Sequence, residues 1–267
     1  MLATWGTKQG RYDPLIKAGR LVCWFSCGAA SACATKMALE HFAGQLETHI
    51  CYCDTGSEHP DNARFLKDCE AWFEHPITVL KHEKYQTIYD VFRDVKYIKH
   101  PHGAPCTDVL KKEMRRRFEL FDDCQVFGFD MGEQKRHREF CERNPEVMTL
   151  APLIVLSLCK EECFALLSDA KIEIPAMYKL GYRNNNCIGC VKGGMGYWNK
   201  IRRDFPDTFE AMAKLERELG FSINSGEHRE GKKRVKDPVF LDELDPDRGD
   251  YGKEPSVSCG ATGCNKE

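Results

Sequence analysis

The chain has 267 residues, of which 42% are hydrophobic, enough to bury a full core in one large domain or in a domain with an appendage. Its 39 lysines and arginines face 41 aspartates and glutamates, a net charge of −2. A dedicated nucleic-acid binder usually carries an excess of positive charge. The net charge of this chain therefore does not indicate a nucleic-acid substrate. We find no signal-peptide core and no run of roughly 18 apolar residues. We therefore expect a cytoplasmic globular enzyme with no membrane partner.

Cysteine is unusually frequent, with 15 residues. A reducing compartment keeps thiols free, so a disulfide framework is not expected. Most of the cysteines fall within strand or helix patterns and are predicted to be small apolar core residues; these include Cys23, Cys33, Cys51, Cys69, Cys141 and Cys163. The cysteines on turn-rich segments are left as candidate metal ligands or nucleophiles.

The first half of the chain alternates apolar runs with amphipathic stretches. The pattern predicts strands at 21–25, 48–53, 77–80 and 125–129, and helices at 31–41, 61–75, 85–95 and 108–121. Strands that alternate with helices are typical of a parallel sheet. We therefore predict an α/β fold for residues 1–155, a Rossmann-like parallel sheet with helices on both faces.

The second half follows a different pattern. Helices are predicted at 160–171 and 206–219, with a polar, glycine-rich insert at 184–196 between them. From Ser222 onward the chain is charged, rich in turns and weakly apolar, which predicts an irregular tail ending in SCGATGC. Residues 156–267 are thus expected to form a helical, cysteine-bearing C-terminal region with an irregular tail.

Two short loops in the first half follow predicted strands. The first, SCGAAS, could offer a phosphate the backbone N–H groups and hydroxyls of Ser26, Gly28 and Ser31, because glycine permits a tight turn and a helix N-terminus favours an anion. A plain turn between strand and helix is the alternative. The second, DTG, places Asp54, Thr55 and Gly56 after the next strand.

Parallel strands end at the same edge of a sheet, so the two loops are expected to lie side by side. Asp54 could accept hydrogen bonds from ribose hydroxyls there. The alternative is that Asp54 and Asp61 only cap and turn the chain.

The order of motifs is more specific than either loop. S-x-G-x-x-S is followed by DTGxxxP, a Cys-Thr-x-x-Leu-Lys segment at 106–111, GFDxxExxR at 128–136, and CxxC. This order resembles the phosphoadenosine phosphosulfate (PAPS) reductase family of the adenine nucleotide α-hydrolase-like, or PP-loop, superfamily, over roughly residues 20 to 200.

The resemblance implies roles for individual residues. Ser26, Gly28 and Ser31 would bind the phosphate of an adenine nucleotide, Asp54 with Thr55 and Gly56 its ribose side, and Lys111 a phosphate or sulfate. Glu133 and Arg136 would close the catalytic site. ATP-hydrolysing relatives usually show S-G-G-x-D-S, whereas Cys27 and Ala30 stand here at the second residue and the acidic position. The loop is therefore closer to the reductase type, which binds a nucleotide without splitting it at the α-phosphate.

Three cysteines have the character of metal ligands. Cys187 and Cys190 stand at ligand spacing on a glycine-rich turn, and Cys106 lies at a predicted helix start near Lys111, which favours its thiolate. The resemblance implies a four-iron four-sulfur cluster (4Fe-4S) held by these segments. Family members usually carry adjacent cysteines in the first segment, but Pro105 precedes Cys106 here.

The fourth ligand must then come from Cys259 or Cys264, or be absent, and we assign it to Cys264. A zinc site and a metal-free redox pair remain alternatives to the cluster. The segment SCGATGC also resembles the C-terminal Cys-Gly element with which reductases of this family attack the sulfonate sulfur. Cys259 is therefore the predicted catalytic nucleophile, with Cys264 as resolving thiol or ligand, although the family's terminal histidine is missing.

The leading hypothesis is a PAPS reductase-family oxidoreductase that reduces a sulfonucleotide through Cys259 and is reduced in turn by a thioredoxin-like protein. The alternative is an ATP-dependent sulfurtransferase that adenylates a substrate and thiolates it with sulfide from the cluster. A third hypothesis is a binding module with a structural metal and a regulatory nucleotide. PAPS and ATP are thus both candidate nucleotides.

Overall fold

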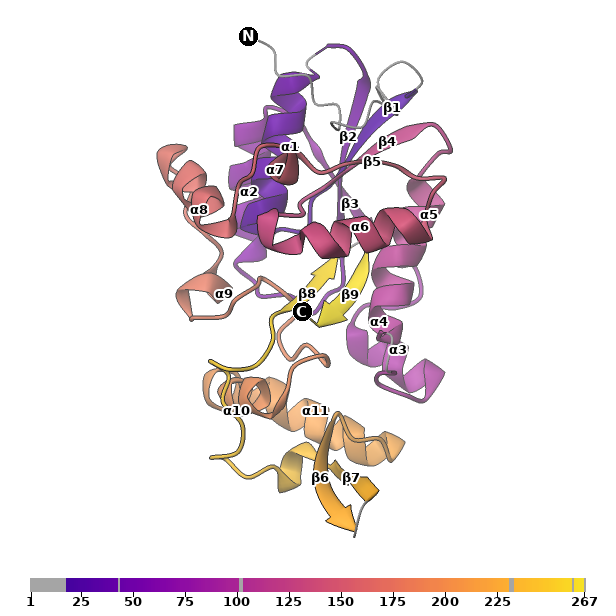
Figure 1. The fold of residues 1–267 in the computed structure, drawn as a ribbon, viewed down its shortest axis with the longest axis vertical. Coiled ribbons are helices and arrows are strands. Elements are labelled where there is room, and N and C mark those ends of the chain that lie inside the picture. Colours follow the sequence, from indigo (N-terminus) through magenta and orange to yellow (C-terminus); the bar gives the residue numbers. More distant parts are fainter. Residues whose placement is uncertain (1–17, 43, 101–102, 231–232, 261, 267) are drawn as a thin grey trace. The chain divides into compact units, whose positions relative to one another are not determined.

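The computed structural model describes residues 18–266 except 43, 101–102, 231–232 and 261 (Figure 1). The chain forms two compact units. Unit 1 consists of Met1–Cys53, Pro60–Leu80 and Met114–Asn185, and unit 2 of Asp54–His59, Lys81–Glu113 and Asn186–Glu267. The two units therefore do not meet at the single boundary predicted near residue 155. The chain passes between the units several times, because the turn after the second strand and the segment 81–113 pack with the C-terminal third.

Unit 1 is built on a five-stranded sheet of order β3-β2-β1-β4-β5. β1 pairs in parallel with β2 and β4, and β4 in parallel with β5. The strands are β1 (Arg20–Trp24), β2 (Glu47–Asp54), β3 (Ile77–Lys81), β4 (Asp123–Phe127) and β5 (Met148–Leu150). The α/β fold with a Rossmann-like parallel sheet is confirmed.

The two faces of this sheet are covered by different helices (Figure 1). Leu21, Cys23 and Phe25 face a core shared with α1, because alternate residues of a strand point to the same side. Trp24 points to the other side, where its ring lies 6.1 Å from that of Phe118. One face thus carries α1 (Ala29–His41), α2 (Asn62–Phe73), α7 (Pro152–Val155) and α8 (Lys160–Asp169), and the other α5 (Met114–Phe118) and α6 (Gln134–Arg143). The short α9 (Ala176–Lys179) follows α8.

Most of the cysteines predicted to lie in the core do so: Cys23, Cys33, Cys51, Cys69 and Cys163 are buried. Cys141 differs and is only partly buried. Its Sγ lies 3.3 Å from Thr149 Oγ1 and 3.5 Å from His137 Nε2. Polar partners at the end of α6 thus keep this thiol out of the apolar core.

The helical segments of unit 2 before Ser222 are α3 (Ile88–Val95), α4 (Pro105–Thr107), the π-helical η2 (Asp108–Glu113), α10 (Met195–Asp204) and α11 (Pro206–Leu219). The single helix predicted over 108–121 is instead η2 followed by α5, which ends at Phe118. The predicted polar insert also ends earlier than expected, because α10 buries Tyr197, Trp198 and Ile201. These three apolar side chains anchor α10 within the unit.

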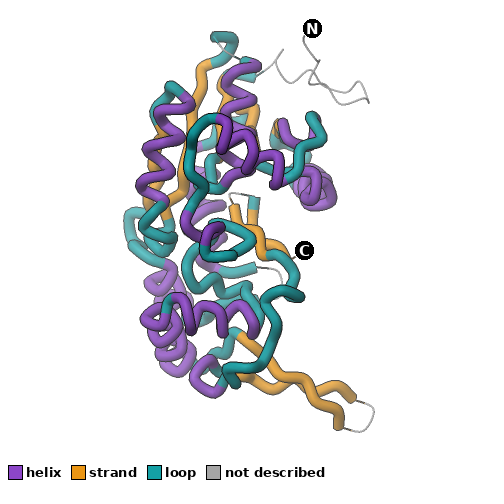
Figure 2. Tube along the Cα trace, turned by 90° about the vertical axis from the view of Figure 1, so that its left-hand side faces the viewer, coloured by secondary structure: helices purple, strands orange, loops and turns teal. Residues whose placement is uncertain are grey.

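The irregular tail predicted after Ser222 is wrong over most of its length. It contains the antiparallel hairpin of β6 (Asn224–Glu230) and β7 (Lys233–Val239), the short η4 (Leu241–Glu243), and a second antiparallel hairpin of β8 (Val257–Gly260) and β9 (Gly263–Lys266). Figure 2 shows β6 and β7 as a two-stranded ribbon. Leu241 and Leu244 are buried, and the Glu216 carboxylate accepts the N–H groups of Ile223 and Leu241 at 2.5 Å. Long-range contacts of this kind order a segment whose own apolar content is low.

Candidate functional site

The strand order of unit 1 marks one place for a ligand. β1 has β2 on one side and β4 on the other, so the direction of winding reverses at β1. In open α/β sheets, ligands bind outside the carboxyl ends of the strands at such a switch point. Here the carboxyl ends of β1 and β4 lead into the loops that begin at Phe25 and Gly128.

The loop after β1, Ser26–Ser31, is organised by one hydroxyl. Ser31 Oγ accepts hydrogen bonds from the N–H groups of Ser26 at 3.1 Å and Gly28 at 3.3 Å, and donates to the carbonyl of Gly28 at 2.9 Å. The hydroxyl of Ser26 lies 3.1 Å from the same oxygen. The three residues predicted to bind phosphate thus form one connected group directly before α1, with backbone N–H groups that converge on an oxygen atom.

Cys27 accounts for part of the departure from the ATP-hydrolysing pattern. Its φ of 59° lies in the left-handed region that favours glycine. The side chain is buried, with Sγ 3.7 Å from the carbonyl of Asn62, and Asn185 Nδ2 donates to the Cys27 carbonyl at 2.6 Å. Contacts from α2 and from the segment after α9 therefore hold the loop in a conformation that costs about 1 to 2 kcal/mol for a non-glycine residue.

The loop after β4 lies against the same helix start. A Cβ atom on Gly128 would come within 2.5 Å of Ser31 Cα and 2.6 Å of Ser31 N, so only glycine fits this approach. Farther along, Asp130 Oδ1 accepts the Gly132 N–H at 2.9 Å, and burial raises the pKa of the Asp130 carboxyl. The GFD segment is thus packed directly onto the Ser26–Ser31 loop.

Glu133 and Arg136 form an ion pair at the start of α6. The Arg136 guanidinium carbon lies 5.2 Å from the centre of the Phe129 ring. Both charged side chains are largely buried, at 14% and 10% exposure, so the pair is held in place by its surroundings. The two predicted catalytic residues are therefore next to each other in unit 1.

The DTG turn belongs to unit 2. Asp54 Oδ1 accepts the Gly56 N–H at 2.8 Å, and Asp54 Oδ2 pairs with Lys81 Nζ at 2.8 Å. Gly56 has a φ of 62°, and a Cβ there would lie 1.8 Å from the Gln86 carbonyl oxygen. These contacts agree with the alternative interpretation of Asp54, in which its carboxylate only closes the turn. Its contact with a ribose remains a prediction.

Thr55 links this turn to a group of cysteines. Its Oγ1 lies 3.1 Å from Cys187 Sγ, and its N–H donates to Glu58 Oε2 at 3.2 Å. Cys187 Sγ is also 3.8 Å from Glu58 Oε1. Lys111 Nζ lies 3.9 Å from the same Glu58 oxygen, and both charged side chains are buried. A carboxylate, an ammonium and a thiol therefore meet in the interior of unit 2.

Four thiols of unit 2 interact with one another, and we refer to Cys106, Cys187, Cys190 and Cys259 as the cysteine set. Burial raises the pKa of the Cys106 thiol, and the nearby Cys259 and Cys190 raise it further. Burial also raises the pKa of Cys187 well above its ordinary value, with Glu58 and Cys259 adding to the effect. Lys111 opposes both shifts. These thiols would lose their protons on binding a metal cation.

The cysteine set is assembled from three separate segments. Cys106 lies in α4, Cys187 and Cys190 in the turn before α10, and Cys259 in β8. Thr107 Oγ1, one residue after Cys106, is 3.4 Å from Cys259 Sγ. Asn186, one residue before Cys187, donates to the Val257 carbonyl at 2.6 Å. The C-terminal hairpin is thus tied to both other segments.

Among the residues that the structure describes, no three His, Cys, Asp or Glu side chains converge as they would around a single metal ion. An iron–sulfur cluster takes thiolate ligands on different iron atoms, which spaces the sulfurs more widely than around a single ion. Four soft sulfur donors within electrostatic range of one another, mostly removed from water, fit such a cluster. The cysteine set is therefore the part of the chain that could hold it.

The structure brings Cys106, Cys187 and Cys190 together as predicted for ligands, and adds Cys259, which the sequence suggested as a nucleophile. The side chain of Cys264, the predicted fourth ligand, lies outside the described part of the chain; its backbone pairs with that of Cys259 across the hairpin. Sequence reasoning missed Glu58 and Thr107 as neighbours of these thiols. Thr107 directly follows Cys106 and Glu58 stands two residues after the DTG turn, and this nearness in the chain was the one signal available.

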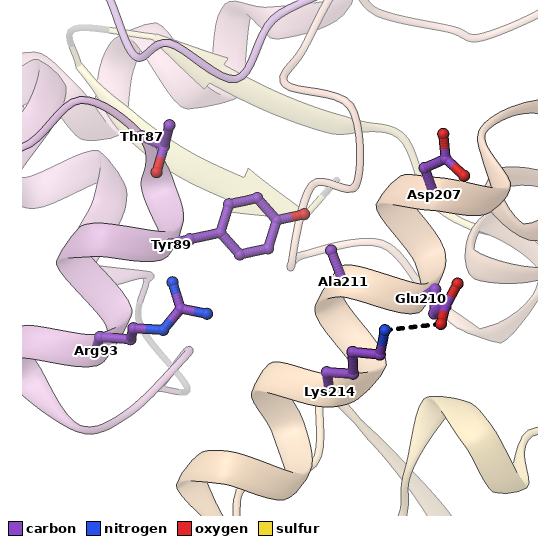
Figure 3. Close-up of a pocket in the computed structure, with 7 residues that line it drawn as sticks. All are labelled: Thr87, Tyr89, Arg93, Asp207, Glu210, Ala211 and Lys214. Atoms are coloured by element: carbon purple, nitrogen blue, oxygen red, sulfur yellow. Dashed lines mark ion pairs between the residues drawn. The ribbon is translucent and has the colours of Figure 1, made fainter.

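A groove of about 450 Å³ opens elsewhere in unit 2 between α3 and α11 (Figure 3). Three of its charged side chains are paired: Lys214 Nζ lies 2.8 Å from Glu210 Oε1, and Arg93 Nε lies 3.1 Å from Glu218 Oε2. Asp207 also lines the groove. Tyr89 forms one wall, and burial raises the pKa of its hydroxyl to about 12, with Cys187 contributing. The groove therefore lies near the cysteine set.

No protein-family model matches the chain, and no curated protein matches it. Among solved structures, the chain is similar to a crystal structure of phosphoadenylyl-sulfate (PAPS) reductase from Candida auris in a phosphate complex. The TM-score is 0.44 at 10% sequence identity, over 67% of this chain and 90% of that one. The family resemblance continues to rest on the motifs of this sequence. None of the described helices is both long and apolar enough to cross a membrane.

Proposed function

We propose that this chain is an adenine-nucleotide-dependent enzyme of sulfur chemistry that reduces a sulfonucleotide such as PAPS through a thiol of the C-terminal hairpin. The observation that carries the proposal is the cysteine set. Its cysteines come from three segments of unit 2 that are up to about 150 residues apart in the chain, and contacts of Thr107 with Cys259 and of Asn186 with Val257 tie these segments together.

The two units would divide the task. In unit 1, the N–H groups of Ser26 and Gly28 would donate to a phosphate oxygen, in place of the hydroxyl oxygen of Ser31 that they contact now. Arg136, paired with Glu133 at the switch-point edge of the sheet, would bind a second anionic group. The absence of an acidic residue at Ala30 suits binding of a nucleotide without cleavage at the α-phosphate.

In unit 2, Cys106, Cys187 and Cys190 would hold a 4Fe-4S cluster together with a fourth thiolate. The cluster would supply positive charge and electron-accepting iron. The Lys111 ammonium opposes the larger effect of burial on the pKa of Cys106 and Cys187, and so would favour the thiolate form that iron binds. Glu58 would hold the Lys111 ammonium in place.

The reaction itself is a thiol attack on sulfonate sulfur. The thiolate of the hairpin would form an S–S bond to that sulfur while the S–O bond to the nucleotide breaks, and the nucleotide would leave with the electron pair. A thioredoxin-like dithiol would then attack the cysteine sulfur and release sulfite. The reductant would end as a disulfide, so two electrons pass from its thiols to the sulfonate sulfur.

The test is anaerobic incubation of freshly purified protein with ³⁵S-labelled PAPS and a dithiol reductant, with iron and sulfide measured on the same sample. We expect labelled sulfite. The proposal is overturned if a sample that retains its iron and sulfide releases none.

A second candidate, ATP-dependent sulfur transfer, is favoured by the same cysteine set, because a cluster can carry sulfide. It predicts substrate-dependent pyrophosphate release from ATP and no sulfite from PAPS. A parallel incubation with ATP and candidate acceptors separates the two reactions. A structural metal with a regulatory nucleotide would give neither product.

A further inference from the structure

Deepening the proposed function, on which it rests, we propose that Cys259 is the fourth cysteine ligand of the cluster. The sequence assigned this place to Cys264 and made Cys259 the nucleophile. The new assignment follows from where the structure places the Cys259 thiol and from how firmly β8 is attached to the other two cysteine segments.

The number of cysteines poses the problem. A 4Fe-4S cluster bound wholly by protein takes four thiolates, and the first segment offers only Cys106, with Pro105 before it. With Cys187 and Cys190 the count reaches three. A fourth thiolate has to come from a distant part of the chain.

Cys259 meets this need by position. Its Sγ lies 3.4 Å from Thr107 Oγ1, and Thr107 directly follows Cys106 in α4. The thiols of Cys106 and Cys187 both interact electrostatically with that of Cys259. Cys259 therefore belongs to the same group of sulfurs as the three ligands expected from the sequence.

The attachment of β8 also suits a ligand. Asn186 directly precedes Cys187, and Val257 stands two residues before Cys259. Asn186 Nδ2 donates to the Val257 carbonyl at 2.6 Å. Strand β9 packs on η2, the segment that follows α4. The hairpin is thus held on both sides of the cysteine set, and such attachment keeps a metal ligand in place.

Cys264 is the remaining cysteine of the hairpin. The register places it directly opposite Cys259, with Gly260 opposite Gly263 at the turn. Opposite residues of an antiparallel pair have Cα atoms about 4.5 to 5.5 Å apart. The backbone therefore brings a second cysteine close to the proposed cluster ligand, so a variant of each is needed to tell the two apart.

The experiment compares Cys259→Ser with Cys264→Ser after anaerobic reconstitution with iron and sulfide. Iron, sulfide and the visible absorbance of the cluster are measured before and after a challenge with a chelator. We expect Cys259→Ser to lose iron about tenfold faster than the parent protein, and Cys264→Ser to match the parent. Equal retention by Cys259→Ser, or loss by Cys264→Ser alone, overturns the inference.

A second measurement needs no variant and so does not depend on folding of the substituted protein. The loaded protein is alkylated anaerobically, and the labelled cysteines are identified by mass spectrometry before and after iron removal. We expect Cys259 to be protected in the loaded protein and to be labelled after iron is removed. Equal labelling of Cys259 in both states overturns the inference.

The outcomes also separate this inference from the proposed function. A parent protein that binds iron and sulfide through Cys259 but makes no sulfite overturns only the sulfonucleotide reaction. A parent protein that makes sulfite while Cys259→Ser retains its iron overturns only the ligand assignment. A parent protein that binds neither iron nor sulfide overturns the ligand assignment and the cluster together.

Discussion

The Ser26–Ser31 loop and the cysteine set are built in opposite ways. Six consecutive residues form the loop, and one hydroxyl, that of Ser31, joins its N–H groups. The cysteine set draws on α4, the turn before α10 and β8, which are separated by up to about 150 residues. The residues of the loop are therefore adjacent in the sequence, whereas those of the cysteine set come together only when the chain folds.

The two regions also differ in charge. The loop carries no ionisable side chain except the buried thiol of Cys27, so its proposed ligand would be bound by N–H groups and hydroxyls. The cysteine set lies next to the buried Lys111 and Glu58 pair. Metal content, redox state and pH should therefore act on unit 2 and leave nucleotide binding in unit 1 nearly unchanged.

The largest expected effect is that of Cys187→Ser. Loss of a cluster ligand should lower sulfite formation at least about 100-fold, because the substituted site no longer holds iron firmly. Nucleotide affinity should change less than about twofold, since the phosphate loop lies in the other unit. Sulfite release and isothermal titration with a nucleotide measure the two effects.

Cys141→Ser is the matched control, because serine can keep the contacts with Thr149 and His137. It should retain both activity and iron. Parallel loss of nucleotide affinity in Cys187→Ser would show that the two regions are one coupled site.

The next largest effect is expected from Gly128→Ala, which adds a methyl group where the loop after β4 lies against α1. In Gly128→Ala the new Cβ would fall 2.5 Å from Ser31 Cα, so the backbone must shift. We expect about 2 to 4 kcal/mol of lost stability and a nucleotide affinity lowered about tenfold or more, with iron content unchanged. Denaturant unfolding and titration measure these quantities.

Gly56→Ala sharpens the same comparison from the other unit. Its Cβ would lie 1.8 Å from the Gln86 carbonyl oxygen, and its φ of 62° disfavours alanine. The displaced turn carries Thr55 and Glu58, so iron retention should fall. Unchanged iron in Gly56→Ala would contradict the contact between this turn and the cysteine set.

A pH effect is expected in unit 2 from Glu216. Burial raises the pKa of its carboxyl to about 7. The folded protein then keeps this proton at pH values where the unfolded chain has lost it, so stability is greatest at low pH and falls as pH rises from about 4.5 to about 7. The loss is about 3 kcal/mol.

Urea unfolding between pH 5 and pH 8 measures this slope, and hydrogen exchange at Ile223 and Leu241 localises it, because both N–H groups donate to Glu216. Glu216→Gln should abolish the slope. A slope that persists in Glu216→Gln would assign it to another group.

The smallest effect is expected for Ser31→Ala. The substitution removes the acceptor of two N–H groups and should lower stability by about 1 to 2 kcal/mol. Nucleotide affinity should fall about fivefold, because the loop loses the contact that orders it before the phosphate arrives. Ser168→Ala, at an exposed position of α8, should change neither quantity.

Much of the fold could be predicted from the sequence because its signals are local. Apolar runs and helical spacing gave β1, β2, β3 and β4 to within about two residues, and α11 over its full length from Pro206 to Leu219. The hairpins after Ser222 could not be predicted in this way. Their strands are polar, and the buried groups that order the segment, such as Leu241 and Glu216, meet only through long-range contacts.

The same division holds for the two candidate sites. The sequence by itself determined the Ser26–Ser31 loop and the identity of Cys106, Cys187 and Cys190 as candidate ligands, because turn chemistry and CxxC spacing act over a few residues. Only the tertiary structure decided that Cys259 lies beside Thr107 and that Glu58 and Lys111 adjoin Cys187. Contacts between residues far apart in the chain produce no repeating pattern in the sequence. They depend on how the whole chain folds, so they cannot be predicted from local patterns.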